Sequence, residues 1–146
     1  MAAFNIYLNF PGTAEEAFNL YKSVFGGEFA TIMRFKDTPG CSEMPGMTAE
    51  IEQKVMHIAL PVGNGNMLMA TDAVDGMGQP LQVGNNVSIS VSPASKDETH
   101  KFFDGLAAGG TVLVPLAPAF WGGYFGMLKD KFDIQWMFNY DEKQNQ

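Results

Sequence analysis

The sequence has little of several residue types, and each shortage argues against a class of protein. The chain of 146 residues holds one cysteine, Cys41, so an intramolecular disulfide is excluded, and a reducing cytoplasm is the simplest location. No apolar run approaches the roughly 18 to 20 residues that a membrane-spanning helix needs, and the start MAAFNIYLNF lacks the basic residues of a signal peptide. Only 9 lysines and arginines oppose 16 acidic residues, and the net charge of −7 argues against a nucleic-acid partner.

Several catalytic signatures are also missing. The sequence contains no G-x-S-x-G nucleophile motif, no P-loop and no dinucleotide fingerprint. Cys41 lies in a loop rich in proline and glycine, far in sequence from both histidines, which disfavours a thiol nucleophile. The composition is that of an ordinary folded protein, with 46% hydrophobic and 17% charged residues, and the length suits one domain over residues 1–146.

Two segments of the chain repeat the same strand pattern. NIYLNF (5–10) and NVSISV (86–91) alternate apolar with polar residues, as half-buried strands do. Three further strand candidates follow in each half. They span 29–35, 55–62 and 66–72 in the first half, and 111–116, 124–130 and 134–139 in the second. The turns GNG (63–65) and DKFD (130–133) are predicted to close the hairpins.

A helix is predicted between the first and second strands of each half. Each helix begins with a capping-box pattern, in which a hydroxyl accepts from the first turn and a glutamate three residues later reaches back. The two boxes are Thr13 with Glu16, and Ser95 with Glu98. Glycine pairs at 26–27 and near 109–110 predict the helix ends.

These elements together predict an α+β fold built from two tandem βαβββ modules. Module one spans 1–75, a glycine-rich linker 76–84, module two 85–140 and a tail 141–146. The first module also has a long insertion at 36–54, and loops of this length are usually functional or mobile. Each curved mixed sheet is expected to bury one face against its helix. The other faces are expected to line a cavity between the modules, which is the default ligand site.

Three longer stretches carry a resemblance to a known family. They are AEEAFNLYKSVFGGEF, MHIALPVGNGNMLMATD and PAFWGGYFGMLKDKFDIQWMFN. With the doubled module, they make the chain resemble the vicinal oxygen chelate superfamily, which includes glyoxalase I, the bleomycin-resistance proteins and the extradiol dioxygenases. Within it the chain resembles the PhnB-like subgroup, which often has glycine where this chain has Asp133, a residue that also tolerates a left-handed turn. The resemblance implies a homodimer.

The resemblance also implies a divalent metal (Zn, Ni, Fe or Mn) between the modules, with His, Glu or Gln ligands from the first and last strand of each. The matching positions fall near Asn5 and Asn86 in the first strands, and near Leu68 or Met69 and Trp136 or Met137 in the last. None is His or Glu, and asparagine and methionine suit such metals poorly, so no metal site is predicted. A rearranged site on His57 and Asp72 would offer two donors, fewer than a good metal site needs.

The subgroup has been labelled by analogy as a methyltransferase, and the sequence does not support that chemistry. Methyl transfer needs a nucleotide-binding strand followed by a glycine-rich turn and a helix, whereas the glycine pairs here follow helices.

His57 and Asp72 are the candidates for a catalytic role. If Met56, Ile58 and Leu60 pack on the helix, His57 faces the cavity on the other side of the strand. It would then be a hydrogen-bonded cavity residue, a substrate-binding group or general base, or a metal ligand. Asp72 ends the next strand, where it either stabilises a turn or orients His57.

Six further residues are predicted to bind a ligand: Asn5, Met69, Asn86, Trp121, Tyr124 and Trp136. Trp121 lies among glycines, where an aromatic ring often forms the mouth of a pocket. Trp136 shares a strand face with Ile134 and Phe138, and that face is either core or cavity. His100 is expected on the surface of its helix. Methionines gather on the strands, where they would form either an adaptable apolar lining or core filling.

The sequence supports three hypotheses of function. The first is a protein that binds a small, largely apolar molecule in the cavity between the modules. Such a protein either only binds this molecule or also converts it without a metal. The second is a metal-dependent lyase, isomerase or dioxygenase with a rearranged site. The third is a resistance protein that sequesters a drug, and the acidic net charge is consistent with a cationic ligand there. Tight metal retention would favour the second, and drug binding without turnover the third.

Overall fold

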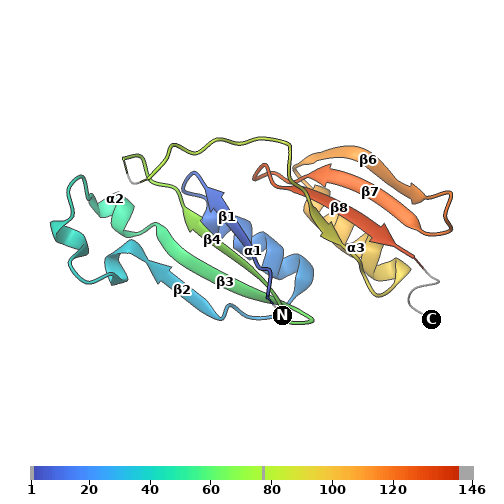
Figure 1. The fold of residues 1–146 in the computed structure, drawn as a ribbon, viewed down its shortest axis with the longest axis horizontal. Helices are drawn as coiled ribbons and strands as arrows, with labels where there is room; N and C mark the ends of the chain where they lie inside the picture. The colour runs from blue at the N-terminus through green and yellow to red at the C-terminus, as the bar shows by residue number, and fades with distance from the viewer. Residues whose placement is uncertain (1, 77, 142–146) are drawn as a thin grey trace. The chain divides into compact units, whose positions relative to one another are not determined.

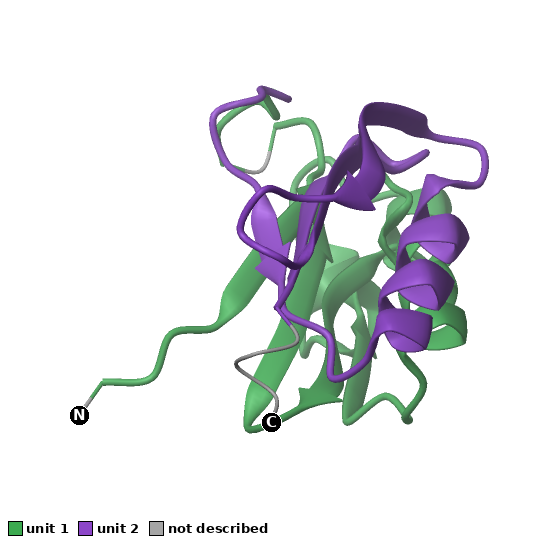
Figure 2. Cartoon of the chain, turned by 90° about the vertical axis from the view of Figure 1, so that its right-hand side faces the viewer, with its two compact units in different colours: residues 1–82 green, residues 83–146 purple. Residues whose placement is uncertain are grey.

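The computed structural model describes residues 2–76 and 78–141, which form two compact units, Met1–Gln82 and Val83–Gln146 (Figure 2). We call them unit 1 and unit 2. The elements of unit 1 are β1 (Ile6–Phe10), α1 (Ala14–Phe25), β2 (Thr31–Arg34), the short 3-10 turns η1 (Phe35–Asp37) and η2 (Cys41–Glu43), α2 (Ala49–Glu52), β3 (Val55–Gly63) and β4 (Asn66–Asp72). The elements of unit 2 are β5 (Ile89–Val91), α3 (Lys96–Ala107), β6 (Thr111–Pro118), β7 (Tyr124–Lys129) and β8 (Gln135–Tyr140).

Each unit contains one four-stranded mixed sheet, and the two sheets have the same topology (Figure 1). The order is β1-β4-β3-β2 in unit 1 and β5-β8-β7-β6 in unit 2. The first and last strands of each unit pair in parallel, and the remaining pairs are antiparallel. The predicted α+β class and the doubled βαβββ module are therefore confirmed. None of the helices in the described segments is long and apolar enough to cross a membrane.

The core of unit 1 lies between α1 and one face of its sheet. Phe18 on α1 meets the ring of Phe10 edge-on at 6.3 Å and the ring of Tyr21 at 5.4 Å. Ile58 and Leu60 on β3 are fully buried, as the alternation in this strand predicts. These contacts hold α1 on the face of the sheet that carries the even-numbered residues of β3.

The core of unit 2 is built in the same way around α3. The ring of Phe103 on α3 meets the ring of Phe138 on β8 edge-on at 5.7 Å. Opposite Phe138 lies Gly126, where an added Cβ would stand 2.8 Å from the Phe103 ring. Glycine at this position therefore lets the helix approach the sheet closely.

A buried carboxylate shapes the turn between β7 and β8. Asp130 is 2% exposed and accepts hydrogen bonds from the amides of Phe132 and Ile134 and from the indole N–H of Trp136, the last at 2.8 Å. Asp133 has φ +71°, so it adopts the left-handed conformation that the sequence analysis allows for this residue.

Of the two predicted capping boxes, the one at Thr13 is wrong and the one at Ser95 is confirmed for its hydroxyl, whereas the Glu98 carboxylate accepts from the amide of Ala94. The hydroxyl of Ser95 accepts from the amide of Glu98 at 3.0 Å, as predicted for α3. The side chain of Thr13 makes no capping hydrogen bond at the start of α1. A carboxylate distant in sequence, Asp72, accepts from the amide of Ala14 instead. The local pattern at 13–16 predicted the helix start correctly and its hydrogen-bond partner wrongly.

One strand begins later than the sequence predicts. The strand predicted at 86–91 begins only at Ile89, and Val87 is 75% exposed, so the first half of the segment is not paired. The insertion predicted at 36–54 contains η2, α2 and most of η1. Cys41, in η2, is buried at 4% exposed.

Candidate functional site

The sheet of unit 1 has one face covered by α1 and one face that α1 leaves uncovered, which we call the open face. Ile58 and Leu60 point toward α1, and side chains alternate along a strand. His57 and Ala59 therefore lie on the open face. This placement is the one that the sequence predicts for His57, considered within unit 1 alone.

Two rows of side chains cross the open face. The strand pairing places Asn9 beside Thr71 and His57 beside Met33, and these four form the first row. The second row contains Tyr7, Met69, Ala59 and Thr31. The rings of Tyr7 and His57 stack with centroids 5.9 Å apart and planes 26° apart. Tyr7 is 47% exposed, so this ring pair presents an aromatic surface that a ligand can contact.

A cavity of about 750 Å³ adjoins the first row. Its walls are Asn9, Phe35, Thr71 and Asp72, together with residues 73–74 and 78–82 of the segment that follows β4. Asp72 is the only ionisable side chain among them. The remaining lining combines amides and a hydroxyl with apolar groups, a mixture typical of small-molecule sites.

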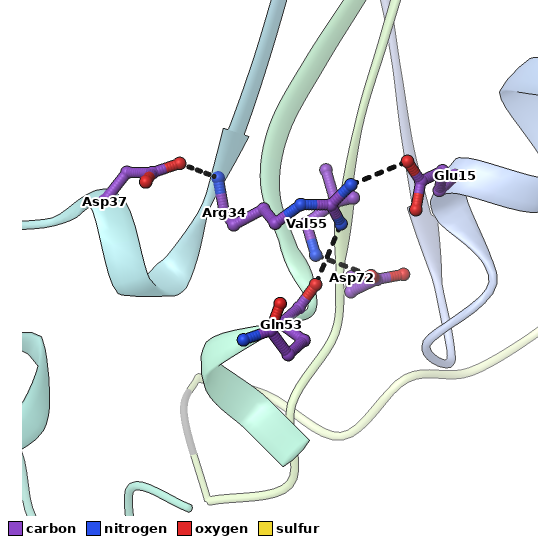
Figure 3. A network of polar contacts seen from close by, with 6 residues as sticks. All are labelled: Glu15, Arg34, Asp37, Gln53, Val55 and Asp72. Atoms are coloured by element: carbon purple, nitrogen blue, oxygen red, sulfur yellow. Dashed lines mark hydrogen bonds and ion pairs between the residues drawn. The ribbon is translucent and has the colours of Figure 1, made fainter. Parts of the chain in front are cut away.

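The carboxylate of Asp72 is hydrogen-bonded to the protein backbone (Figure 3). The side chain is 4% exposed, and its two oxygens accept from the amides of Ala14 and Val55, each at 2.8 Å. The first of these bonds satisfies an amide at the N-terminus of α1, where negative charge is also favoured by the helix dipole. Asp72 pairs with buried Phe10 and so points to the α1 side, opposite His57. Asp72 was predicted either to stabilise a turn or to orient His57. These contacts show it instead stabilising the backbone of α1 and β3, which are distant in sequence.

Arg34 connects the insertion at 36–54 to α1 (Figure 3). Its guanidinium donates to the Glu15 carboxylate at 2.7 Å and to the carbonyl oxygen of Gln53 at 2.9 Å, and its backbone amide donates to Asp37. The hydrogen bond to Glu15 is the main reason that the pKa of Arg34 is raised. A smaller cavity of about 300 Å³ lies beside this network. The two cations that line this cavity already have acceptors. Those of Arg34 are given above, and Lys54 Nζ lies 3.4 Å from the carbonyl oxygen of Gly12.

The predicted ligand-binding residues are dispersed in the structure. Asn5 and Asn86 are exposed and precede β1 and β5, while Met69 lies on the open face of unit 1. In unit 2, Trp121 is 39% exposed, and its ring meets those of Phe120 and Phe125 edge-on in the turn between β6 and β7.

Tyr124 and Trp136 lie on the α3 side of their sheet. The Tyr124 ring contacts Lys96, whose Nζ is 4.9 Å from its centroid, and the exposed His100, whose ring centroid is 5.7 Å away. Trp136 is 1% exposed and donates to Asp130. The sequence left Trp136 either in the core or in the cavity, and the structure places it in the core.

Sequence reasoning missed Tyr7, Asn9, Met33 and Thr71. The alternation in NIYLNF carried the signal for the first two, since the residues between Ile6, Leu8 and Phe10 must face away from the core. Met33 and Thr71 become neighbours of His57 only through the pairing of β2, β3 and β4, which no local pattern specifies.

The donor groups do not fit the metal that the resemblance implies. No group of three or more His, Cys, Asp or Glu side chains within 2–76 and 78–141 is placed to hold a metal ion. Of the positions considered, Leu68 is buried on the α1 side, and Met69 on the open face supplies a soft thioether that suits Zn or Fe poorly. We therefore derive no chemical step through a metal.

Comparisons with known proteins agree with this architecture. A family model described as 3-demethylubiquinone-9 3-methyltransferase matches residues 2–138. The chain belongs to this family. Its likeness to a PhnB protein, and a fold shared with fosfomycin resistance and glyoxylase/bleomycin resistance proteins, confirm the resemblance seen in the sequence.

Three relatives of this PhnB-like chain match over almost their whole length. The crystal structure of PA1353 from Pseudomonas aeruginosa is 35% identical, with a TM-score of 0.83, over 97% of this chain and 98% of that one. A putative 3-demethylubiquinone-9 3-methyltransferase, PhnB protein, from Bacillus cereus is 28% identical, with a TM-score of 0.73, over 95% and 99%. Protein YjdN of Escherichia coli K12 is 23% identical over 94% of this chain and 95% of that protein.

A more distant structure shows the fold alone. A glyoxylase/bleomycin resistance protein/dioxygenase domain from Frankia is 15% identical, with a TM-score of 0.62, over 98% of this chain and 93% of that one.

Proposed function

We propose that this protein binds a small, largely apolar molecule on the open face of unit 1. The supporting observation is the cavity of about 750 Å³ beside Asn9 and Thr71, next to which lies the stacked Tyr7–His57 pair. The volume lies within the range of roughly 300–1,000 Å³ that is usual for sites of drug-sized ligands. Met33 and Met69 add flexible, polarisable side chains that adapt to the shape of a ligand.

The charge around the cavity favours a neutral or cationic ligand. No lysine or arginine lines it, and its one carboxylate, Asp72, already accepts two backbone hydrogen bonds. An anionic ligand would lose its hydration without gaining a cation in exchange, which is unfavourable. Asn9 and Thr71 offer neutral groups for orientation.

Binding explains these features better than the methyl transfer that gives the family its name. A methyl donor that is a nucleotide needs a glycine-rich turn between a strand and a helix. The turn between β1 and α1, Pro11-Gly12-Thr13, contains one glycine, and the amide of Ala14 after it is occupied by Asp72. His57 is assigned the role of a polar anchor beside the methionines of the open face.

The test is a fragment screen read from methionine methyl groups. With methyl-¹³C methionine, ligands on the open face should shift the resonances of Met33 and Met69 and leave those of Met127 and Met137 on unit 2 unchanged. His57→Ala should weaken a hit by about tenfold, equivalent to one net hydrogen bond of about 1.4 kcal/mol. His100→Ala is the matched control, since it removes the other histidine, exposed on α3, and should leave the affinity unchanged.

Two results would contradict this proposal. One is a set of hits that never perturbs Met33 or Met69. The other is an equal affinity of a hit for the wild type and for a folded His57→Ala variant. The homodimer and the cytoplasmic location stay predictions; light scattering on the purified protein measures the first.

A further inference from the structure

The aromatic ring of Phe35 is set apart from the other buried rings of unit 1. Phe35 is 8% exposed and forms part of the wall of the cavity of about 750 Å³. The rings of Phe10 and Tyr21 both meet the ring of Phe18 in the core, whereas the Phe35 ring meets no other aromatic ring in the described part of the chain. A ring in a cavity wall that has no ring partner is available to the ring of a ligand, and such a pair is worth more than the area that it buries.

An irregularity at the end of β2 directs Phe35 toward the cavity. The consecutive residues Met33 and Arg34 do not pair with consecutive residues of β3, because Met56 is skipped between their partners. Such a bulge redirects the side chains beside it and is common next to binding and active sites. The side chain of Arg34 reaches α1, and the next residue, Phe35, lines the cavity.

Arg34 fixes the backbone immediately before Phe35 (Figure 3). Its guanidinium joins two other segments of unit 1, since it donates to the Glu15 carboxylate on α1 at 2.7 Å and to the carbonyl oxygen of Gln53, after α2, at 2.9 Å. Both charged side chains are partly buried, at 27% and 42% exposed for Arg34 and Glu15, so this pair is screened less than one in open water. The two bonds run in different directions and therefore resist rotation of the chain at the end of β2.

Two contacts on the other side of Phe35 hold the turn η1. The Asp37 carboxylate accepts from the backbone amide of Arg34 at 2.9 Å, and the Thr38 hydroxyl donates to the sulfur of Met56 at 3.0 Å. Phe35 thus lies between two fixed ends of a short turn. A ring that is already in place spares a ligand the entropy cost of ordering it, which is the benefit of preorganisation.

We propose that Phe35 selects ligands that carry an aromatic ring, and that Arg34 is the positioning residue that holds Phe35 in the cavity wall. This inference rests on the proposed function, because it concerns the same cavity. The matched probes are benzyl alcohol and cyclohexylmethanol, which differ only in whether the ring is aromatic. Each carries one hydroxyl, which Asn9 and Thr71 in the same wall are able to orient.

The experiment titrates both probes by NMR and follows the methyl resonance of Met33. The wild type should bind benzyl alcohol roughly fivefold tighter than cyclohexylmethanol, the factor expected for one aromatic pair, and Phe35→Leu should abolish this preference. Arg34→Met and Glu15→Gln, neither of which alters a residue of the cavity wall, should each lower it at least about twofold, because the wall is then correctly formed only part of the time. Glu16→Gln is the matched control, since this exposed carboxylate has no partner in the described part of the chain, and it should keep the preference.

The ratio of the two affinities separates positioning from general loosening of the fold, which would weaken both probes alike. Three results would overturn the inference: equal affinities of the probes for the wild type, a preference that survives in Phe35→Leu, or a wild-type preference in both Arg34→Met and Glu15→Gln. Probes that bind at Met33 without an aromatic preference overturn this inference alone. A fragment screen in which no hit moves Met33 or Met69 overturns the proposed function as well, so the two failures are distinguishable.

Discussion

Replacement of Asp72 tests the role that the structure gives this residue. Asp72→Ala removes the acceptor of two buried hydrogen bonds, to the amides of Ala14 and Val55, each 2.8 Å long. Both residues are at most 1% exposed, so water does not replace the lost carboxylate easily. An unsatisfied buried donor costs about 1–3 kcal/mol, so two of them lower the free energy of unfolding by about 3–5 kcal/mol.

Three further variants separate this effect from ordinary helix capping. Asp72→Asn keeps one acceptor oxygen and should cost about 2 kcal/mol. Thr13→Ala should cost less than about 0.5 kcal/mol, because the Thr13 hydroxyl makes no capping bond. Ser95→Ala should cost about 1 kcal/mol, since Ser95 does cap α3.

Urea unfolding at neutral pH measures these differences. Far-UV circular dichroism follows both units, whereas the only two tryptophans of the chain, Trp121 and Trp136, report unit 2. If the units unfold separately, Asp72→Ala shifts the circular dichroism transition and leaves the fluorescence transition in place. A loss below about 1 kcal/mol for Asp72→Ala, or an equal loss for Thr13→Ala, would refute the reasoning.

Three other predictions follow from buried groups and close contacts. Asp130→Ala should cost about 3–5 kcal/mol in urea unfolding and shift the fluorescence of Trp136, its indole partner; an unchanged emission spectrum would contradict the bond. Gly123→Ala should cost more than about 3 kcal/mol by the same assay, because its Cβ would overlap the carbonyl oxygen of Tyr140. A loss within about 0.5 kcal/mol would be incompatible with that contact. The Cys41 thiol should react with a disulfide reagent at pH 8 at least about tenfold more slowly in the folded protein than in urea. The reason is that burial raises the pKa of this thiol and blocks access of the reagent. Equal rates would show that Cys41 in η2 is accessible in the folded protein.

Local patterns predicted most of the elements, because they depend on neighbouring residues only. Alternation in NIYLNF and in 55–72 identified β1, β3 and β4, and glycines at 63 and 65 identified the hairpin between the last two. The same reasoning failed where the sequence signal was local and the interaction was not. Thr13 has the sequence context of a cap, but the acceptor that reaches the helix comes from 58 residues further along the chain.

The candidate site was only partly predictable for a related reason. Alternation divides the residues of β3 into two sets, and it placed His57 opposite Ile58 correctly. It does not say which side chains of other strands lie beside His57, because those depend on strand order and register. Tyr7, Met33 and Thr71 were therefore missed, although all three are readable in the sequence once the pairing is known.

The sequence by itself determined the repeated βαβββ module, the helix ends and the left-handed turn at Asp133, because these follow from side-chain periodicity and backbone sterics within a few residues. Only the tertiary structure decided that Asp72 holds α1 and β3 and that Trp136 is core. These outcomes depend on which buried donors and acceptors meet across the fold. Hydrogen bonds between distant segments form only after the strands have paired, so no window of the sequence contains them.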